Sequence, residues 1–438
     1  MQQNLTEGPI TKKLILFALP LMAGNILQQL YNIVDTLIVG RVLGEIALGA
    51  VGSSFALMTF LNSIIIGLCM GSSAYFSMQY GKKDFNRLRQ SVFVAFVAIG
   101  TVALVLNVAV YFGIEGILWF MRVPAASAPI MKEYLLYIFA GILAVFLYNF
   151  LANLLRAMGN SLVPLAFLGV SAVLNIFLDL LFVLQMDMRV AGAALATVIS
   201  QYISAIGLLV YYFRKCSELW VRREHRKWSN RILKDVAGLS VLTCVQQSIM
   251  NFGILMVQGL VNSFGTAVMA AFTAAVKIDA FAYAPVQDFG NAFSTFVAQN
   301  YGAGNKDRIR KGIKSAGTMA IIFCLSISAL VCIFAKSLMM IFVEGDKMEI
   351  IRIGVEYLHI EGACYVGSGL LFLFYGYYRA MNRPGVSVVL TVISLGTRVV
   401  LAYVLSAIPG IGVKGIWFSI PIGWMLADVA GALAMRRE

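Results

Sequence analysis

The chain has 438 residues, 60% hydrophobic and 13% charged, with a mean hydropathy of +0.84. One soluble core of this size cannot bury so much apolar surface, so the composition excludes an ordinary soluble protein and predicts many membrane crossings. The formal net charge of +13 comes from basic residues in short loops between apolar runs. We therefore expect contact with membrane lipids and no nucleic-acid partner.

Twelve apolar runs approach or exceed the ~20 residues that a helix needs to cross ~30 Å of hydrocarbon. The first six are expected at 14–40, 46–70, 91–113, 133–155, 162–184 and 191–213. The other six are expected at 236–262, 267–298, 315–337, 353–378, 385–407 and 413–434. The eighth run contains Lys277, Asp279, Pro285 and Asp288, so we expect it to tilt, bend or line water. The fold class is all-α integral membrane.

The loops carry their positive charge asymmetrically. Of the 34 Lys and Arg residues, 24 lie on one side of the predicted membrane and 8 on the other. Because short cytoplasmic loops are enriched in Lys and Arg, both termini are predicted to be cytoplasmic. We expect a multi-pass protein of a prokaryotic inner membrane, acting as a monomer. The polar N-terminus leads into a full-length span, so no cleavable signal peptide is expected.

The two halves of the chain resemble each other. QYGKKDFNRLR at 79–89 recurs as NYGAGNKDRIR at 300–310, a spacing of 221. LLRAMGN at 154–160 recurs as YYRAMNR at 377–383, a spacing of 223. The pairs Tyr134-Leu135 with Tyr357-Leu358 and Val190-x-Gly192 with Val413-x-Gly415 keep the second spacing. Four matches at nearly one spacing indicate an internal duplication.

The duplication predicts a domain organisation. The lobes are 1–213 and 236–438, and a basic cytoplasmic linker, 214–235, joins them. Six spans is an even number, so both copies insert the same way up. The predicted architecture is two pseudo-symmetric six-helix bundles, related by an axis along the membrane normal, with a cavity between or within them.

Asp35 stands inside the first apolar run, and Gln28 and Tyr31 share its helix face. Asp179 stands in the fifth run, with Asn175 four residues before it on the same face. Carboxylates within hydrocarbon are costly and are functional by default, so we interpret the pair as a proton or cation site. The alternative is that they only join helices by hydrogen bonds.

The second half does not duplicate this acidic pair. At a spacing of 223, the counterpart of Asn175 is Arg398 and that of Asp179 is Ala402. Arg398 is expected to pair with a carboxylate inside its own bundle. Lys277 and Glu361 are secondary candidates, either paired with each other across helices or serving a substrate or ion. Asp428 is expected to make a helix-end contact.

Several motifs together resemble a known family. ALPLMAGNILQQLYNIVDTLIVGRVLG at 18–44, the YGKKD and RAMGNS loops, and N-x-x-x-D at 175–179 are similar to those of multidrug and toxic compound extrusion (MATE) transporters. The resemblance covers essentially the whole chain and is nearest to the DinF-like branch. It implies a V-shaped pair of six-helix lobes and export of cationic or amphipathic compounds in exchange for H⁺ or Na⁺.

The resemblance also implies roles for particular residues. It assigns the coupling acids to Asp35 and Asp179 and a bending proline to Pro20. It assigns the polar shell of the cavity to Asn175, Thr197 and Tyr134. NorM-type members carry a cation-binding acid in span seven, where this chain has only Gln246, Gln247 and Gln258. That departure weakens a sodium site in the C-terminal lobe, although Glu361 remains.

Other classes of function are disfavoured by what the sequence lacks. No GxxxxGK[ST] motif appears, so the energy for transport must come from a gradient or a partner. The six cysteines form no CxxC pair, and we expect no metal or cofactor beyond the coupling H⁺ or Na⁺. A lipid-linked precursor flippase of the same superfamily and a passive channel are alternatives. An integral-membrane enzyme, a third alternative, would need a clustered catalytic set such as HExxH, which is absent.

Overall fold

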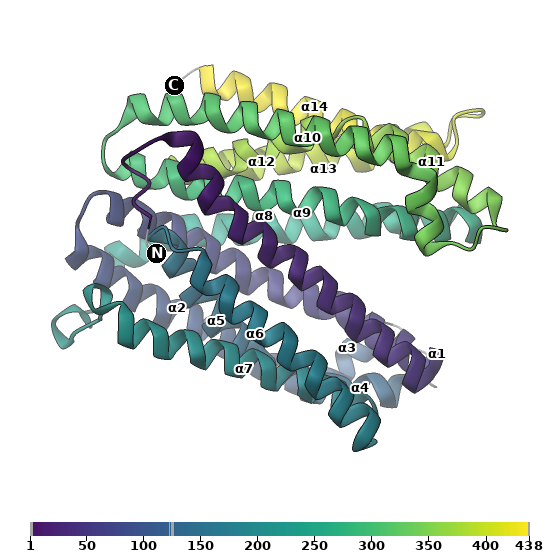
Figure 1. Cartoon of the computed structure of the whole chain (residues 1–438), viewed down its shortest axis with the longest axis horizontal. Coiled ribbons are helices and arrows are strands. Elements are labelled where there is room, and N and C mark those ends of the chain that lie inside the picture. The colour runs from purple at the N-terminus through teal and green to yellow at the C-terminus, as the bar shows by residue number, and fades with distance from the viewer. Residues whose placement is uncertain (1–2, 122, 124–126, 437–438) are drawn as a thin grey trace. The chain divides into compact units, whose positions relative to one another are not determined.

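The computed structural model describes residues 3–121, 123 and 127–436. Within these residues the regular elements are all helical (Figure 1). Eleven helices or continuous helical segments of the described chain are long and apolar enough to span a membrane, and one bent pair brings the number to twelve. The all-α membrane fold predicted from the sequence is confirmed.

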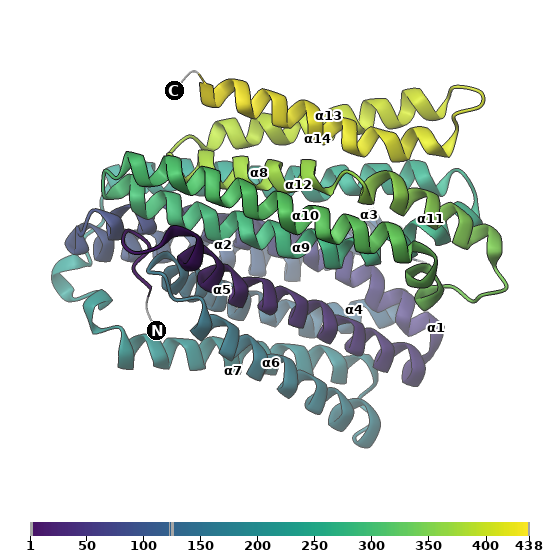
Figure 2. The same cartoon turned by 45° about the horizontal axis from the view of Figure 1, so that its top comes forward.

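The first half contains α1 (Ile10–Gly81), α2 (Phe85–Phe112), α3 (Ile114–Phe120), α4 (Ala128–Ile138), η1 (Phe139–Gly141), α5 (Ile142–Ala157), α6 (Leu162–Asp179), the π-helical η2 (Leu180–Gln185) and α7 (Arg189–Lys215). Two short 3₁₀ turns, η3 (Ser217–Leu219) and η4 (Arg223–His225), form the linker. The second half contains α8 (Asn230–Asn262), α9 (Thr266–Gly302), α10 (Lys306–Phe342), α11 (Met348–Gly362), α12 (Tyr365–Ala380), α13 (Pro384–Ser406) and α14 (Val413–Arg436). Figure 2 shows α13 and α14 running side by side.

The element α1 holds the first two spans, Ile10–Gly40 and Gly49–Gly81. Gly44 separates them, since its φ of 84° and ψ of 179° are not helical. Glycine adopts this conformation without a steric penalty. The helix continues through Pro20, and α9 likewise continues through Pro285.

Left-handed backbone positions recur between the halves. Five residues of the first half with positive φ have counterparts with positive φ at the two spacings of the sequence repeat: Gly44 with Gly265, Lys83 with Gly304, Gly159 with Asn382, Asp187 with Gly410, and Arg189 with Gly412. Positive φ is uncommon outside glycine, so five such coincidences confirm the duplication independently of side-chain identity.

The two compact units formed by helix packing do not have the same limits as the two copies of the sequence repeat. One compact unit holds Ala23–Cys244 with the residues before Leu5, and the other holds Leu5–Met22 with the chain from Val245 onward. Each half therefore contributes the start of its first helix to the unit built mainly from the other half. The lobe limits at 213 and 236 describe the repeat and stay a prediction.

Two equivalent arginines hold these exchanged segments. In one unit, Arg87 at the start of α2 binds Asp235 of α8 at 3.1 Å. In the other, its repeat counterpart Arg308 of α10 donates hydrogen bonds to the carbonyl oxygens of Leu5, Glu7 and Gly8. A guanidinium presents several donors in a fixed fork, so one side chain can hold an irregular segment of backbone.

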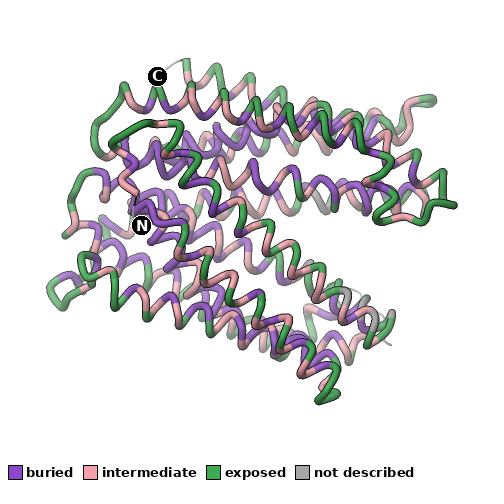
Figure 3. Tube along the Cα trace, viewed as in Figure 1, coloured by how far each residue is buried: buried purple, intermediate pink, exposed green. Residues whose placement is uncertain are grey.

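Close helix contacts depend on glycine. A Cβ atom placed on Gly71 would lie 2.4 Å from Ser240 Cα and 2.5 Å from Leu239 O of α8. At Gly67, one turn earlier, it would lie 2.6 Å from Cys244 Cα. Small residues at such positions let helix backbones approach each other in a membrane. Large apolar side chains are exposed elsewhere, as along α10, where Ile333 is 73% exposed. Figure 3 shows exposed positions recurring along the helices.

The α-helix is interrupted at matching positions in the two halves. The tenth span is broken between α11 and α12, which meet at 50°. In the first half, α4 passes into α5 through the 3₁₀ turn η1, whose residues are the repeat counterparts of this break. Tyr134 of α4 and Tyr357 of α11 lie before these interruptions, at matching positions of the repeat.

Candidate functional site: two buried acidic clusters

Two carboxylic acids of one unit face each other. Asp35 comes from α1 and Asp179 is the last residue of α6, and their carboxyl groups lie within hydrogen-bonding reach. Asp179 is fully buried. Two carboxylates offer only acceptors, and neither oxygen of Asp179 nor Oδ1 of Asp35 finds a donor among the described side chains. The pair therefore lacks the hydrogen-bond donors that normally accompany buried acids.

The backbone changes its winding at this pair. Directly after Asp179 the α-helix widens into the π-helical turn Leu180–Gln185. Such turns are rare and frequently occur at functional sites, since the wider winding redirects side chains. Nothing in the sequence indicates this turn, because its residues, LLFVLQ, fit an ordinary apolar helix.

Aromatic and amide groups surround the pair. Tyr134 of α4 is 7% exposed and lies close enough to Asp35, Asp179 and Tyr31 to interact electrostatically with all three. Tyr31 is hydrogen-bonded to Gln28 one turn earlier on α1 and lies beside Asp35. The common face predicted for Gln28, Tyr31 and Asp35 is thus present in the structure.

An amide and a hydroxyl extend the cluster. Asn175 Nδ2 donates to Thr197 Oγ1 at 3.3 Å, and Thr197 Oγ1 donates to the carbonyl oxygen of Ala193 at 3.1 Å. Asn175 Oδ1 is buried without a donor among the described residues. The structure therefore joins α1, α4, α6 and α7 in one polar cluster. Pro20 is not part of it and belongs to the other unit.

A second cluster lies in the other unit around Asp279 of α9. Tyr357 OH donates to Asp279 Oδ2 at 2.7 Å, and Tyr365 OH donates to Oδ1. Glu361 lies within reach of both Asp279 and Tyr357, and the charge of Arg398 acts on both acids. Arg398 acts on both acids through its charge, while its Nε finds no partner among the described residues, so the expected direct pairing with a carboxylate of its own bundle stays a prediction. Tyr365 was missed from the sequence, because the bend that directs it inward carries no motif.

One alternative for Lys277 and the expectation for Asp428 are wrong. Lys277 does not pair with Glu361: it is exposed, and its ammonium lies 5.9 Å from the ring centroid of Phe342, so a substrate or ion role stays a prediction. Because Asp279 is only two residues away, the two side chains leave the helix on different faces. Asp428 lies inside α14 rather than at its end, and its Oδ1 finds no partner among the described residues.

The two clusters occupy corresponding places but differ in charge. At the spacing of the repeat, Tyr357 is the counterpart of Tyr134, and Arg398 is the counterpart of Asn175. The Asp279 cluster holds two acids with an arginine and two tyrosine donors. The Asp35 cluster holds two acids with an amide in place of the arginine, and no cation among the described residues acts on either acid. Its charge is uncompensated.

The comparisons with known proteins agree with one another. The sequence model of the MatE family matches twice, at residues 20–181 and 241–404, once in each half. A probable multidrug resistance protein of Bacillus subtilis, YpnP, is 30% identical over 99% of this chain and 96% of its own length. The multidrug export protein MepA of Staphylococcus aureus is 22% identical over 98% and 94%.

A solved structure shares the fold. The outward-facing form of a multidrug resistance MATE family transporter of the MOP superfamily superposes with a TM-score of 0.93. The superposition covers 99% of this chain and 96% of that one, at 22% identity. At that identity the likeness concerns the fold, whereas membership of the family rests on the sequence matches.

Proposed function

The chain belongs to the MatE family, and we propose that it is a secondary active antiporter that exports cationic or amphipathic compounds in exchange for H⁺ or Na⁺. Multidrug efflux follows from the family. The coupling ion and the class of substrate are the proposal. The protein moves its substrate without covalent chemistry and needs no cofactor beyond the coupling ion.

One observation carries the proposal: the fully buried Asp179 and the buried Oδ1 of the half-buried Asp35 have no compensating cation or donor among the described residues. Two adjacent carboxylates in an apolar surrounding are costly while both are charged, and a shared proton or a bound cation removes that cost. A protonated carboxyl can donate to its neighbour, which supplies the donor that both acids lack. For Na⁺, the oxygens of Asn175 and Thr197 would complete the set of ligands.

The proposed cycle is alternating access. A proton or Na⁺ arriving from outside removes one of the two negative charges of the pair and displaces the substrate, which leaves to the outside. The ion drives this step only if it binds one conformation more tightly than the other. We propose Pro20 as the hinge of α1, because proline lacks the backbone donor that would stiffen the helix there.

The energetics limit the stoichiometry. Moving one charge through 100 mV is worth ~2.3 kcal/mol, and each tenfold concentration ratio needs ~1.4 kcal/mol. If one monovalent cation leaves for each proton that enters, the electrical terms cancel and the pH gradient alone drives export. For a monovalent cationic substrate, export coupled to net inward current would indicate more than one ion for each substrate.

The decisive experiment measures ethidium transport in everted vesicles under imposed pH and Na⁺ gradients. Asp35→Asn and Asp179→Asn should each abolish coupled transport. Asp187→Asn is the matched control, since Asp187 is exposed and asparagine tolerates its positive φ. Unchanged coupling in both site variants would refute the proposed site, and lipid translocation without ethidium transport would favour the flippase alternative.

We further propose that the protein is a monomer in the inner membrane of a prokaryote, with both termini in the cytoplasm. The excess of basic residues on one side supports this orientation. Cysteine labelling in intact cells checks it. A cysteine replacing Lys82 should react only after the membrane is permeabilised, whereas one replacing Lys347 should react from outside.

A further inference from the structure

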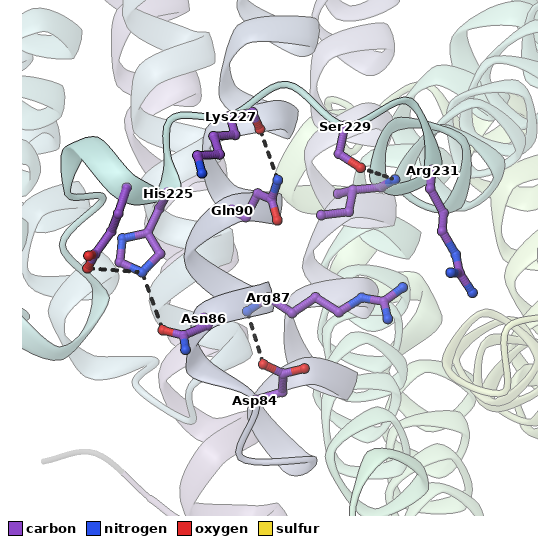
Figure 4. A pocket seen from close by; sticks show the side chains of 10 residues that line it. Asp84, Asn86, Arg87, Gln90, His225, Lys227, Ser229 and Arg231 are labelled. Carbon is purple, nitrogen blue, oxygen red and sulfur yellow. Dashed lines mark hydrogen bonds and ion pairs between the residues drawn. The ribbon is translucent and has the colours of Figure 1, made fainter.

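A polar pocket of about 610 Å³ lies at the N-terminal end of α2, outside both acidic clusters. Three segments of one unit line it: the start of α2, the linker around η4, and the first residues of α8 (Figure 4). Its lining residues are Asp84, Asn86, Arg87, Gln90, Glu224, His225, Lys227, Ser229, Arg231 and Ile232.

Hydrogen bonds fix the walls of the pocket. Gln90 Nε2 donates to the carbonyl oxygen of Lys227 at 3.0 Å, which ties the linker to α2. Asn86 Oδ1 lies 3.3 Å from His225 Nε2, and Ser229 Oγ accepts from the backbone N–H of Ile232. The linker is therefore docked on α2, and the space between them is held open by folded structure.

The charges of the pocket are unequally satisfied. Asp84 caps α2 by accepting from the Arg87 backbone N–H at 3.0 Å, and Glu224 lies 3.6 Å from His225. In contrast, the Lys227 ammonium and the Arg231 guanidinium take part in no hydrogen bond or ion pair with the rest of the described chain. Two cations are thus available to a ligand, and both acids already have partners.

His225 supplies a buried polar atom. The side chain is 7% exposed, and its Nδ1 has no partner among the described residues. In Figure 4, His225 and Lys227 lie toward one end of the pocket, Arg87 and Arg231 toward the other, and Gln90 and Ser229 between them. Imidazole nitrogens, ammonium and guanidinium groups all suit the oxygens of a phosphate.

Two exposed tryptophans of the linker favour a position of this pocket near the lipid headgroups. Trp228 lies between Lys227 and Ser229 in sequence, and Trp220 precedes η4 on the same linker; they are 50% and 42% exposed. Indole rings concentrate at membrane–water interfaces, where an apolar ring and a polar N–H are both accommodated. The pocket is on the side predicted to be cytoplasmic.

We propose that this pocket binds a phosphate ester at the end where His225 and Lys227 lie, with Lys227 neutralising its charge and His225 and Gln90 completing the polar contacts, while Arg231 at the other end attracts the anion at longer range. The ligand joins α2, the linker and α8 in one unit. The shared chemistry is a phosphate with one or two negative charges. An anionic phospholipid presents it at the membrane surface, and a soluble phosphate ester presents it from the cytoplasm.

The experiment compares ligands on the purified full-length protein in a neutral detergent. Short-chain phosphatidylglycerol, phosphatidylcholine of the same chain length and glycerol 3-phosphate are titrated at constant ionic strength, and binding is followed by intrinsic tryptophan fluorescence and thermal stabilisation. Phosphatidylglycerol should bind more tightly than phosphatidylcholine. Glycerol 3-phosphate binding as tightly as phosphatidylglycerol would identify a soluble source for the same site.

Matched variants test the assignment. Lys227→Gln should weaken binding about fivefold, equivalent to about 1 kcal/mol for one cation near a headgroup. Arg231→Gln, at the other end of the pocket, should weaken it about twofold, and the double variant about tenfold. Arg222→Gln with Arg223→Gln removes the same charge from the same linker without touching the lining, and should change affinity less than about twofold. Equal losses in both double variants, or no binding of any phosphate by wild type, would overturn the proposal. The melting temperature of each variant without ligand checks that it folds. The binding measurement does not depend on transport activity.

Discussion

Tyr357 donates a hydrogen bond of 2.7 Å to Asp279, and its repeat partner Tyr134 lies beside Asp35 and Asp179. The same position of the repeat thus holds a tyrosine in both halves. In the second half it binds an acid that has other partners, and in the first half it lies beside an acidic pair that has no compensating charge. The Asp279 cluster is consequently expected to contribute chiefly to stability, whereas the Asp35 cluster is expected to contribute chiefly to transport.

Removing the Tyr357 hydroxyl should destabilise the protein while leaving the aromatic packing intact. The ring lies against Trp417 and Phe272, at centroid distances of 4.9 and 5.5 Å, which Tyr357→Phe preserves. Loss of a buried donor to Asp279 should lower the free energy of unfolding by about 1–3 kcal/mol. Detergent-based unfolding measures it. Tyr403→Phe, at a half-exposed tyrosine, is the control, and equal effects of the two changes would contradict the prediction.

The repeat makes a prediction about backbone strain. Gly304 has a φ of 75°, and a Cβ atom placed on it would meet no neighbour within 4 Å, so Gly304→Ala introduces conformational strain without a clash. We expect a loss of about 1–2 kcal/mol in unfolding free energy. Gly317→Ala in α10, which is equally uncrowded but has no positive φ, should be neutral or stabilising. The reciprocal change Lys83→Gly should stabilise, since it relieves the same strain.

Substitution at the helix crossing should be far more damaging than its size suggests. Gly71→Ala places a methyl group against the backbone of α8 at Ser240, where no side-chain rotation can relieve the contact. We expect a loss of about 1–3 kcal/mol, read as a lower melting temperature and lower yield of folded protein. Gly238→Ala on α8 meets nothing within 4 Å and is the matched control. A tolerated Gly71→Ala would show that the two helices are not in contact.

Cys216, which follows the end of α7, provides a test of local electrostatics. Burial raises the pKa of the Cys216 thiol, and the nearby Glu218 carboxylate raises it further. A raised pKa means less thiolate at a given pH, so maleimide labelling near neutral pH should be slower than for an exposed cysteine. The midpoint of the labelling rate as a function of pH should lie at a higher pH than for an exposed cysteine. In a background without the other five cysteines, Glu218→Gln should shift the midpoint down; no change would contradict this assignment.

Much of the membrane architecture follows from the sequence, because hydrophobic length and basic loops are properties of single helices. The acidic pair was also predictable, since Asp35 and Asp179 are conspicuous in apolar runs. The partners of Asp279 were not, because Tyr365 reaches it only through the 50° bend between α11 and α12. The pocket at the N-terminal end of α2 depends on how the linker packs against α2, and no hydrophobic periodicity in the sequence predicts that packing.

The contact of Arg308 with the carbonyl oxygens of Leu5, Glu7 and Gly8 bears on the order of synthesis. The N-terminal segment leaves the ribosome first, yet its partner lies in the second half of the chain. Gln3 can bind the first half early, since its backbone N–H donates to the carbonyl oxygen of Gly159 at 3.1 Å, but Leu5–Gly8 reach their partner only after the chain up to Arg308 has been made. During that interval the nascent chain offers an exposed helix end to membrane chaperones and proteases, so slow translation of the second half should lower the yield of mature protein.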